Sequence, residues 1–228
     1  MLKPKRKILR KEIERDPFLE SIFSFKEHLK EKKQVYTRVV IGVLAVVLLG
    51  SFYMNSKASS REAADNIISK AMVYVDLGDN DNAMIHLQEV IDEYENTSAG
   101  RNASYYLGRI HFDKGEYEMA LPHFKRYANK GKNALLTGPT YQALVYIYKA
   151  NQDLKNAIKY QKMSIDKANS KEEEAWASLG LAELSLANGD KSTALKLVTR
   201  VQNDYEDNFD LKRKADEIRG KIDAGEQG

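Results

Sequence analysis

The 228-residue chain is 43% hydrophobic and 30% charged, a composition typical of a folded protein, and it contains no cysteine. The lack of cysteine excludes disulfide bonds, thiolate zinc sites and iron–sulfur clusters. The formal net charge of +3 is unevenly distributed, because residues 1–38 contain twelve Lys and Arg against six Asp and Glu. The N-terminal end is therefore basic and the rest of the chain is slightly acidic.

Residues 1–38 form a basic tail, with most of its charge in a cluster over residues 3–11. Phe18, Ile22, Phe25 and Leu29 are spaced i, i+4, i+7 and i+11, which predicts a short amphipathic helix that could lie on a membrane surface. The alternative is that the basic cluster only sets membrane topology and attracts anionic lipid. Because nothing here resembles a base-reading motif, we expect no nucleic-acid partner.

Residues 39–54 carry no charge, and residues 39–56 are predicted to form one transmembrane helix. Tyr36 and Tyr53 suit the two membrane interfaces. The excess of Lys and Arg before the span predicts a cytoplasmic tail and repeats outside the cytoplasm, which in a bacterium means an inner-membrane protein with periplasmic repeats. Two alternatives remain open: a buried core helix, and a signal peptide cleaved near Ala58.

Four alanines share a constant spacing of 37 residues: Ala83, Ala120, Ala157 and Ala194. A fixed period in this range is typical of a solenoid, in which each unit buries its apolar face against its neighbours. A turn precedes each alanine, and a left-handed residue is expected there at Gly78, Gly115, Asn151 and Gly189. Residues 58–228 are therefore expected to form helical hairpins.

Other signals place the helix ends within residues 58–228. Ser59 with Glu62, and Ser170 with Glu173, have the spacing of capping boxes, so a helix is predicted to start at each. Pro139 is expected in the first turn of a helix. Residues 209–222 are rich in charge and are predicted to form a polar helix that caps the stack.

The second unit carries the most specific motif, in which Leu107-Gly108 is followed by Gly115, Tyr117, Ala120 and Phe124. This pattern resembles the tetratricopeptide repeat family, although the usual period is 34 residues. The resemblance implies an all-α, tetratricopeptide-like helical-hairpin solenoid of about four repeats with a C-terminal capping helix, preceded here by one transmembrane helix. The layout also resembles that of bacterial inner-membrane proteins described as ancillary subunits of the SecYEG translocon.

In this family the first helix of each unit lines a concave surface, so the resemblance implies a protein-binding groove at the matching positions. These positions are mostly apolar or aromatic, which favours an apolar segment or a partner protein over an acidic tail. The expected groove residues are Ile68, Met72, Asn102, Tyr105, Arg109, Phe112, Gln142, Tyr146, Lys149 and Trp176.

No catalytic, metal-binding or phosphate-binding motif is found in the sequence, so neither an enzyme nor a cofactor is expected. The histidines lack metal-ligand spacing, and His111 falls where the repeat pattern has a packing aromatic. Glu172, Glu173 and Glu174 fall at a predicted helix start, where carboxylates favour the helix dipole.

The function expected from the sequence is a membrane-anchored protein–protein interaction scaffold. It could be an adaptor that links the export translocon to periplasmic chaperones or substrates. An organiser of the cell envelope, in division or outer-membrane assembly, and a secreted repeat protein are the alternatives. The sequence fixes neither the partner nor the oligomeric state.

Overall fold

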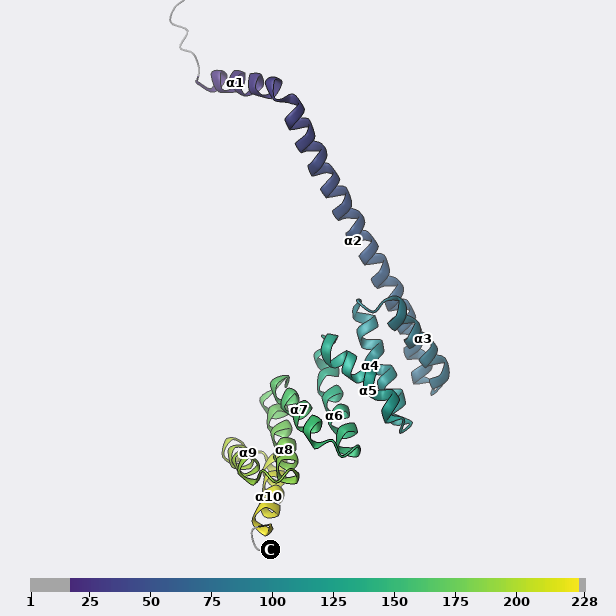
Figure 1. The fold of residues 1–228 in the computed structure, drawn as a ribbon, viewed down its shortest axis with the longest axis vertical. Coiled ribbons are helices and arrows are strands. Elements are labelled where there is room, and N and C mark those ends of the chain that lie inside the picture. The colour runs from purple at the N-terminus through teal and green to yellow at the C-terminus, as the bar shows by residue number, and fades with distance from the viewer. Residues whose placement is uncertain (1–16, 226–228) are drawn as a thin grey trace, which may run out of the picture. The chain divides into compact units, whose positions relative to one another are not determined.

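The computed structural model describes residues 17–225, with side chains from residue 21. The chain divides into two compact units, Met1–Lys57 and Ala58–Gly228. The described residues are all-helical (Figure 1). The basic cluster at residues 3–11 lies outside the described residues.

Unit 1 contains α1 (Pro17–Glu31) and the first part of α2 (Lys33–Asp76). The helix predicted from Phe18 onward is therefore present. Over residues 35–54 the large apolar side chains of α2 are 37–75% exposed. By length and composition α2 is the one helix among the described residues that could cross a membrane.

The helix start predicted at Ser59 is wrong, because α2 continues without a break from unit 1 into the repeats. A capping box stabilises a helix only at its start, where the backbone N–H groups have no carbonyl partners in a preceding turn. Here the preceding turn is helical, so Ser59 and Glu62 lie inside the helix.

Unit 2 is a series of helical hairpins. The C-terminal part of α2 pairs with α3, α4 with α5, α6 with α7, and α8 with α9, and α10 packs against α8 and α9. The helices are α3 (Asn80–Glu93), α4 (Ser98–Asp113), α5 (Tyr117–Lys130), α6 (Ala134–Ala150), α7 (Leu154–Asp166), α8 (Lys171–Ala187), α9 (Lys191–Asp204) and α10 (Phe209–Ala224).

The four repeated alanines are completely buried. Ala83 belongs to one apolar core, Ala120 and Ala157 share a second, and Ala194 belongs to a third. A small side chain at these positions lets two helices approach closely while larger residues fill the space around them. The predicted solenoid of tetratricopeptide-like hairpins is confirmed.

The turns inside the hairpins contain a left-handed residue in every unit. Gly78, Gly115 and Gly189 have φ of 74°, 78° and 82°. In the third unit the left-handed residue is Gln152, with φ 58°, and the prediction of Asn151 is wrong. Gln152 precedes Ala157 by the same number of residues as each glycine precedes its own repeated alanine. The turn therefore requires a left-handed backbone at this position even though the residue is not glycine.

Aspartates cap the second helix in three of these hairpins. Asp79, Asp153 and Asp190 each accept a hydrogen bond from the backbone N–H three residues on. Hydrogen bonding to the side chain of that residue, and then to its backbone N–H, lowers the pKa of each carboxyl group. In the second unit Glu116 makes no such cap.

The start of α6 differs from the prediction. Asn133 caps the helix by accepting from the Leu135 N–H, so Pro139 lies in the second turn and not in the first. The predicted start at Ser170 is confirmed, because its hydroxyl accepts from the Glu173 N–H at 3.0 Å. The Glu173 carboxylate accepts from the Asn169 N–H, one residue before the expected donor.

The last helix, α10, covers the end of the stack as predicted. Leu211, Ala215, Ile218 and Ile222 on one side of it are buried in the third core. Lys214 Nζ lies 2.8 Å from Glu183 of α8, which joins the polar side of α10 to the last hairpin.

Candidate protein-binding groove

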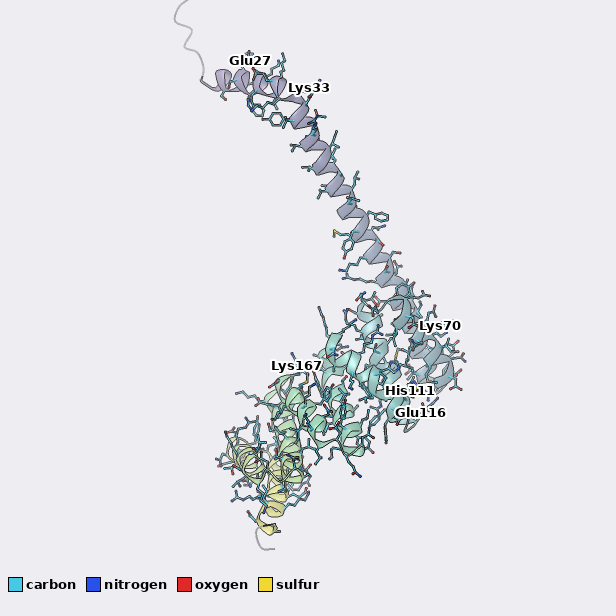
Figure 2. The ribbon with its side chains drawn as sticks, viewed as in Figure 1. Glu27, Lys33, Lys70, His111, Glu116 and Lys167 are labelled. Atoms are coloured by element: carbon cyan, nitrogen blue, oxygen red, sulfur yellow. The ribbon has the colours of Figure 1, made fainter. Side chains whose placement is uncertain are left out.

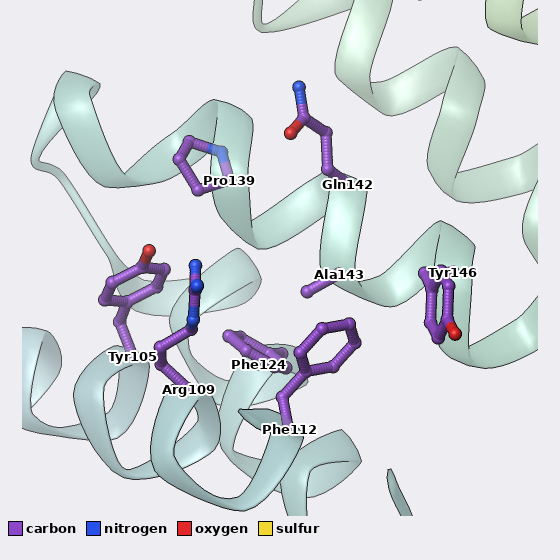
Figure 3. A pocket seen from close by; sticks show the side chains of 8 residues that line it. All are labelled: Tyr105, Arg109, Phe112, Phe124, Pro139, Gln142, Ala143 and Tyr146. Carbon is purple, nitrogen blue, oxygen red and sulfur yellow. The ribbon is translucent and has the colours of Figure 1, made fainter. Parts of the chain in front are cut away.

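One hollow of about 220 Å³ lies between α4, α5 and α6. Figure 3 shows Tyr105, Arg109 and Phe112 extending from α4 toward α6, while Gln142 points away from α4. Five of the predicted groove residues therefore line one site. The lining residues are Tyr105, Arg109, Phe112, Phe124, Pro139, Gln142, Ala143 and Tyr146.

Three aromatic rings close one end of this hollow. The ring centroid of Phe112 is 5.3 Å from that of Tyr117 and 5.2 Å from that of Tyr146, and Tyr117 and Tyr146 are 5.5 Å apart. The two tyrosine hydroxyls are 3.4 Å apart. Tyr146 remains 51% exposed, so a ligand could contact the face of its ring while the other two rings hold it in place.

Tyr105 is mainly a core residue, with only 7% of its surface exposed. Its ring packs edge-to-face against Phe124 at 5.9 Å and Tyr127 at 5.8 Å, and burial raises the pKa of its hydroxyl. It forms the floor of the hollow, so replacing it would disturb the fold as well as the site.

Arg109 supplies the only charged group in this lining. Its Nε donates to both carboxylate oxygens of Asp113 at 2.8 Å, and this bond raises the pKa of the guanidinium. Because Asp113 offsets the charge of Arg109, the hollow carries little net charge. It suits a mostly apolar segment better than an acidic one.

A second hollow, of about 600 Å³, lies between α6, α7 and α8. Pro139 and Gln142 line both hollows and thus form the ridge between them. Two apolar side chains at its border are notably open, Leu135 at 82% and Trp176 at 41%. Trp176 is therefore available to a ligand but belongs to the second hollow, with Gln142 as the only other predicted residue there.

The remaining predicted groove residues do not join either hollow. Ile68 packs against the first apolar core, whereas Met72 and Asn102 are half-buried and Lys149 is exposed. Toward the other end of the unit, α10 covers part of α8 through the Glu183–Lys214 ion pair. The candidate groove is thus concentrated on α4, α6 and the start of α8.

The lining residues that were not predicted from the sequence include Phe124 and Ala143 in the first hollow, and Leu135 in the second. Phe124 was recognisable as a repeat position, but only the fold shows that its ring reaches the concave side. Leu135 gave no signal, because α6 was expected to start near Pro139.

The histidines make packing contacts. The rings of His111 and His123 stack with centroids 5.8 Å apart, and His111 Nδ1 is 2.6 Å from a Glu116 carboxylate oxygen (Figure 2). Burial lowers the pKa of His123. Over the described residues no group of three or more His, Cys, Asp or Glu side chains is placed to hold a metal ion.

Comparison with known proteins agrees with this geometry. A tetratricopeptide repeat family model matches residues 64–97 and 138–166, which cover the first and third hairpins. No curated protein matches the chain. A tetratricopeptide repeat protein from Parabacteroides merdae is 16% identical, with a TM-score of 0.56 over 73% of this chain and 64% of its own. TPR-like repeats from Podosopora anserina are 13% identical, with a TM-score of 0.52 over 73% of this chain and 92% of their own.

At these identities the solved structures show a shared fold and no more. The two matched segments, the buried alanines and the paired helices support the tetratricopeptide repeat family for this chain, and such repeats imply a scaffold for protein–protein interaction.

Proposed function

We propose that this protein is a membrane-anchored scaffold whose repeat unit binds a mainly apolar protein segment at the groove formed by α4, α6 and the start of α8. The observation that carries this proposal is the first hollow, which is lined by five residues expected from the repeat pattern. A solvent-exposed tyrosine supported by two further aromatic rings is typical of an interface anchor.

The charge of the site supports an apolar ligand. Arg109 is paired with Asp113, and the second hollow has one lysine, Lys167, opposed by one carboxylate, Glu173. A strongly acidic tail would find no unpaired cluster of positive charge in these two linings. A segment with aromatic or aliphatic side chains would instead contact Tyr146, Trp176 and Leu135.

Anchoring is proposed from α2 and from the charge that precedes it. The exposed apolar side chains of residues 35–54 have the composition expected in contact with lipid, and basic residues lie on their N-terminal side. This order supports a cytoplasmic N-terminus and repeats in the periplasm of a bacterial inner membrane.

For the finer role we favour an adaptor that brings periplasmic chaperones or emerging substrates to the export translocon. An organiser of the cell envelope would use the same groove for a different partner. A secreted repeat protein would require cleavage near Ala58.

Site-specific photocrosslinking in growing cells tests the binding surface. A photoreactive residue at Gln142, on the ridge between the hollows, should form discrete adducts with envelope proteins. The same residue at Lys162, which is exposed on α7, should not form those adducts. Adding Tyr146→Ala should weaken the Gln142 adducts because it removes the exposed anchor.

Mass spectrometry of the adducts separates the candidate roles. Translocon subunits, chaperones or exported chains would support the adaptor, and division or outer-membrane assembly proteins would support the organiser. If Lys162 yields the same adducts as Gln142, or if Tyr146→Ala changes nothing, the binding surface lies elsewhere.

A further inference from the structure

We infer that α1 lies flat on the cytoplasmic surface of the membrane, with one apolar stripe in the lipid and its lysines against anionic headgroups. This inference rests on the proposed membrane anchor. It adds a second interaction surface, whose partner is an anionic phospholipid bilayer.

The apolar stripe of α1 is open. Ile22 and Phe25 in this stripe are 45% and 64% exposed, and Phe23, outside it, is 63% exposed. At about 100° per residue, Ile22, Phe25 and Leu29 fall within one narrow stripe of the helix. Exposed aromatic and aliphatic side chains on a helix this close to a candidate span need an apolar partner.

Charge is sorted around this stripe. By the same helical geometry, Lys26 and Lys30 fall beside the stripe, whereas Glu27 and Glu31 fall on the opposite side. A helix lying in the interface has this arrangement, because lysines beside the apolar face reach phosphates while carboxylates face water. Residues 21–38 contain five basic side chains against two acidic ones, which favours an anionic surface.

The junction with α2 holds α1 near the membrane. The Lys32 N–H donates to the His28 carbonyl, and the Tyr36 N–H donates to the Lys32 carbonyl, each at 3.1 Å. The His28 ring also packs edge-to-face against Tyr36, with centroids 6.1 Å apart. Tyr36 stands at the expected interface end of the span, so the last turn of α1 is placed at the same depth.

The chain bends at this junction, between Glu27 and Lys33 (Figures 1 and 2). A straight continuation of α2 would carry the apolar stripe out into water. A bend lets α1 run along the surface, where Ile22, Phe25 and Leu29 reach the acyl chains. Phe23 falls between the lysines and the carboxylates, so the expected depth decreases from Phe25 to Phe23 to Glu27.

The test uses the full-length protein, which contains no native cysteine. Single variants Phe25→Cys, Phe23→Cys, Glu27→Cys and Val46→Cys are labelled with an environment-sensitive fluorophore. They are reconstituted into vesicles of phosphatidylcholine with phosphatidylglycerol, and into vesicles of phosphatidylcholine alone. Quenching by spin-labelled lipid and by aqueous iodide then reports the depth of each label.

On anionic vesicles the label at Phe25 should be quenched by lipid and protected from iodide, and the label at Glu27 should show the reverse. Lys26→Gln with Lys30→Gln should reduce the equilibrium constant for binding of α1 to the surface by about fivefold for each lysine removed. Lys70→Gln with Lys162→Gln, which removes the same charge from exposed positions of unit 2, should have no effect on the label.

The label at Val46 separates the two proposals. If lipid quenches Val46 while Phe25 and Glu27 are equally open to iodide, the anchor stands and the α1 inference is overturned. If Val46 is open to iodide, the anchor itself fails. Equal protection of Phe25 on neutral and anionic vesicles would overturn the role of anionic lipid.

Discussion

The two units differ in how far their apolar side chains are exposed. In unit 2, Leu87 and the repeated alanines are completely buried by other helices of the chain. In unit 1, Val46 on α2 is 70% exposed although its surroundings in sequence are more apolar. Unit 2 therefore supplies its own apolar environment, whereas the exposed apolar side chains of unit 1 need one from outside, and we propose that a bilayer provides it.

The largest effect should come from a charge within the span. Val46→Asp should cost about 3 kcal/mol for membrane insertion, because a carboxylate at the centre of a span is strongly unfavourable. The matched control is Val73→Asp, at an exposed valine of the same helix in unit 2. Membrane fractionation should show loss of the first variant and retention of the second. If both variants stay in the membrane fraction equally, residue 46 does not lie in a membrane span as proposed.

A smaller effect should follow from overpacking the repeat core. Ala157→Leu should destabilise unit 2 by about 1–3 kcal/mol, because no space exists beside this buried alanine. The melting temperature should fall by roughly 2–4 °C per kcal/mol. Lys162→Leu, on the exposed side of the same helix, should leave it nearly unchanged. Similar melting temperatures for both variants would contradict the close helix contact.

Removing one buried hydroxyl should cost about 0.5–1.5 kcal/mol. The Tyr127 hydroxyl donates to the Asn133 carbonyl at 2.9 Å and accepts from the Asn133 N–H at 3.1 Å, which holds the chain entering α6. Tyr127→Phe should therefore lower the melting temperature. Tyr117→Phe removes only a 3.4 Å contact at the surface and serves as the control. A larger fall in melting temperature for Tyr117→Phe than for Tyr127→Phe would contradict the structural role of the Tyr127 hydroxyl.

The smallest effect should appear only in acid. Burial lowers the pKa of His123 below its ordinary value of 6.5, and His111 and Arg126 add to the effect. The unfolded chain then binds a proton at a higher pH than the folded one. The contribution to stability is full above pH 6.5 and is lost as the pH falls through the lowered pKa.

Melting curves between neutral and mildly acidic pH check this dependence. His123→Gln, which cannot titrate, should lose less stability than the wild type as the pH falls through this range. If the melting temperatures of the two proteins fall equally as the pH is lowered, His123 is not responsible for the loss of stability in acid.

Much of the fold follows from periodicity, because the spacing of Ala120 and Ala157 fixes which helix faces must meet. Local signals were less reliable where a neighbouring element changed their context. Ser59 has a good capping pattern but lies inside a helix that began earlier. Gln152 takes a left-handed conformation because its register requires one, although glycine and asparagine adopt it more readily.

The sequence predicted which helix faces line the candidate site, but it did not predict how deeply each side chain is buried there. The repeat pattern brought Arg109, Phe112 and Tyr146 to one hollow. It could not show that Phe124 and Tyr127 enclose Tyr105, since a helix register does not reveal how far neighbouring side chains reach. Nor could it show that Leu135 stands open beside Trp176, because this depends on where α6 begins.

The membrane topology is tested by the accessibility of single cysteines to a membrane-impermeant maleimide in spheroplasts. Leu135→Cys should react at once, Glu27→Cys should react only after the inner membrane is permeabilised, and Val46→Cys should stay protected until the protein is denatured. Reaction of Val46→Cys in intact spheroplasts, or protection of Leu135→Cys until permeabilisation, would contradict a membrane-spanning unit 1 with its repeats outside the cytoplasm.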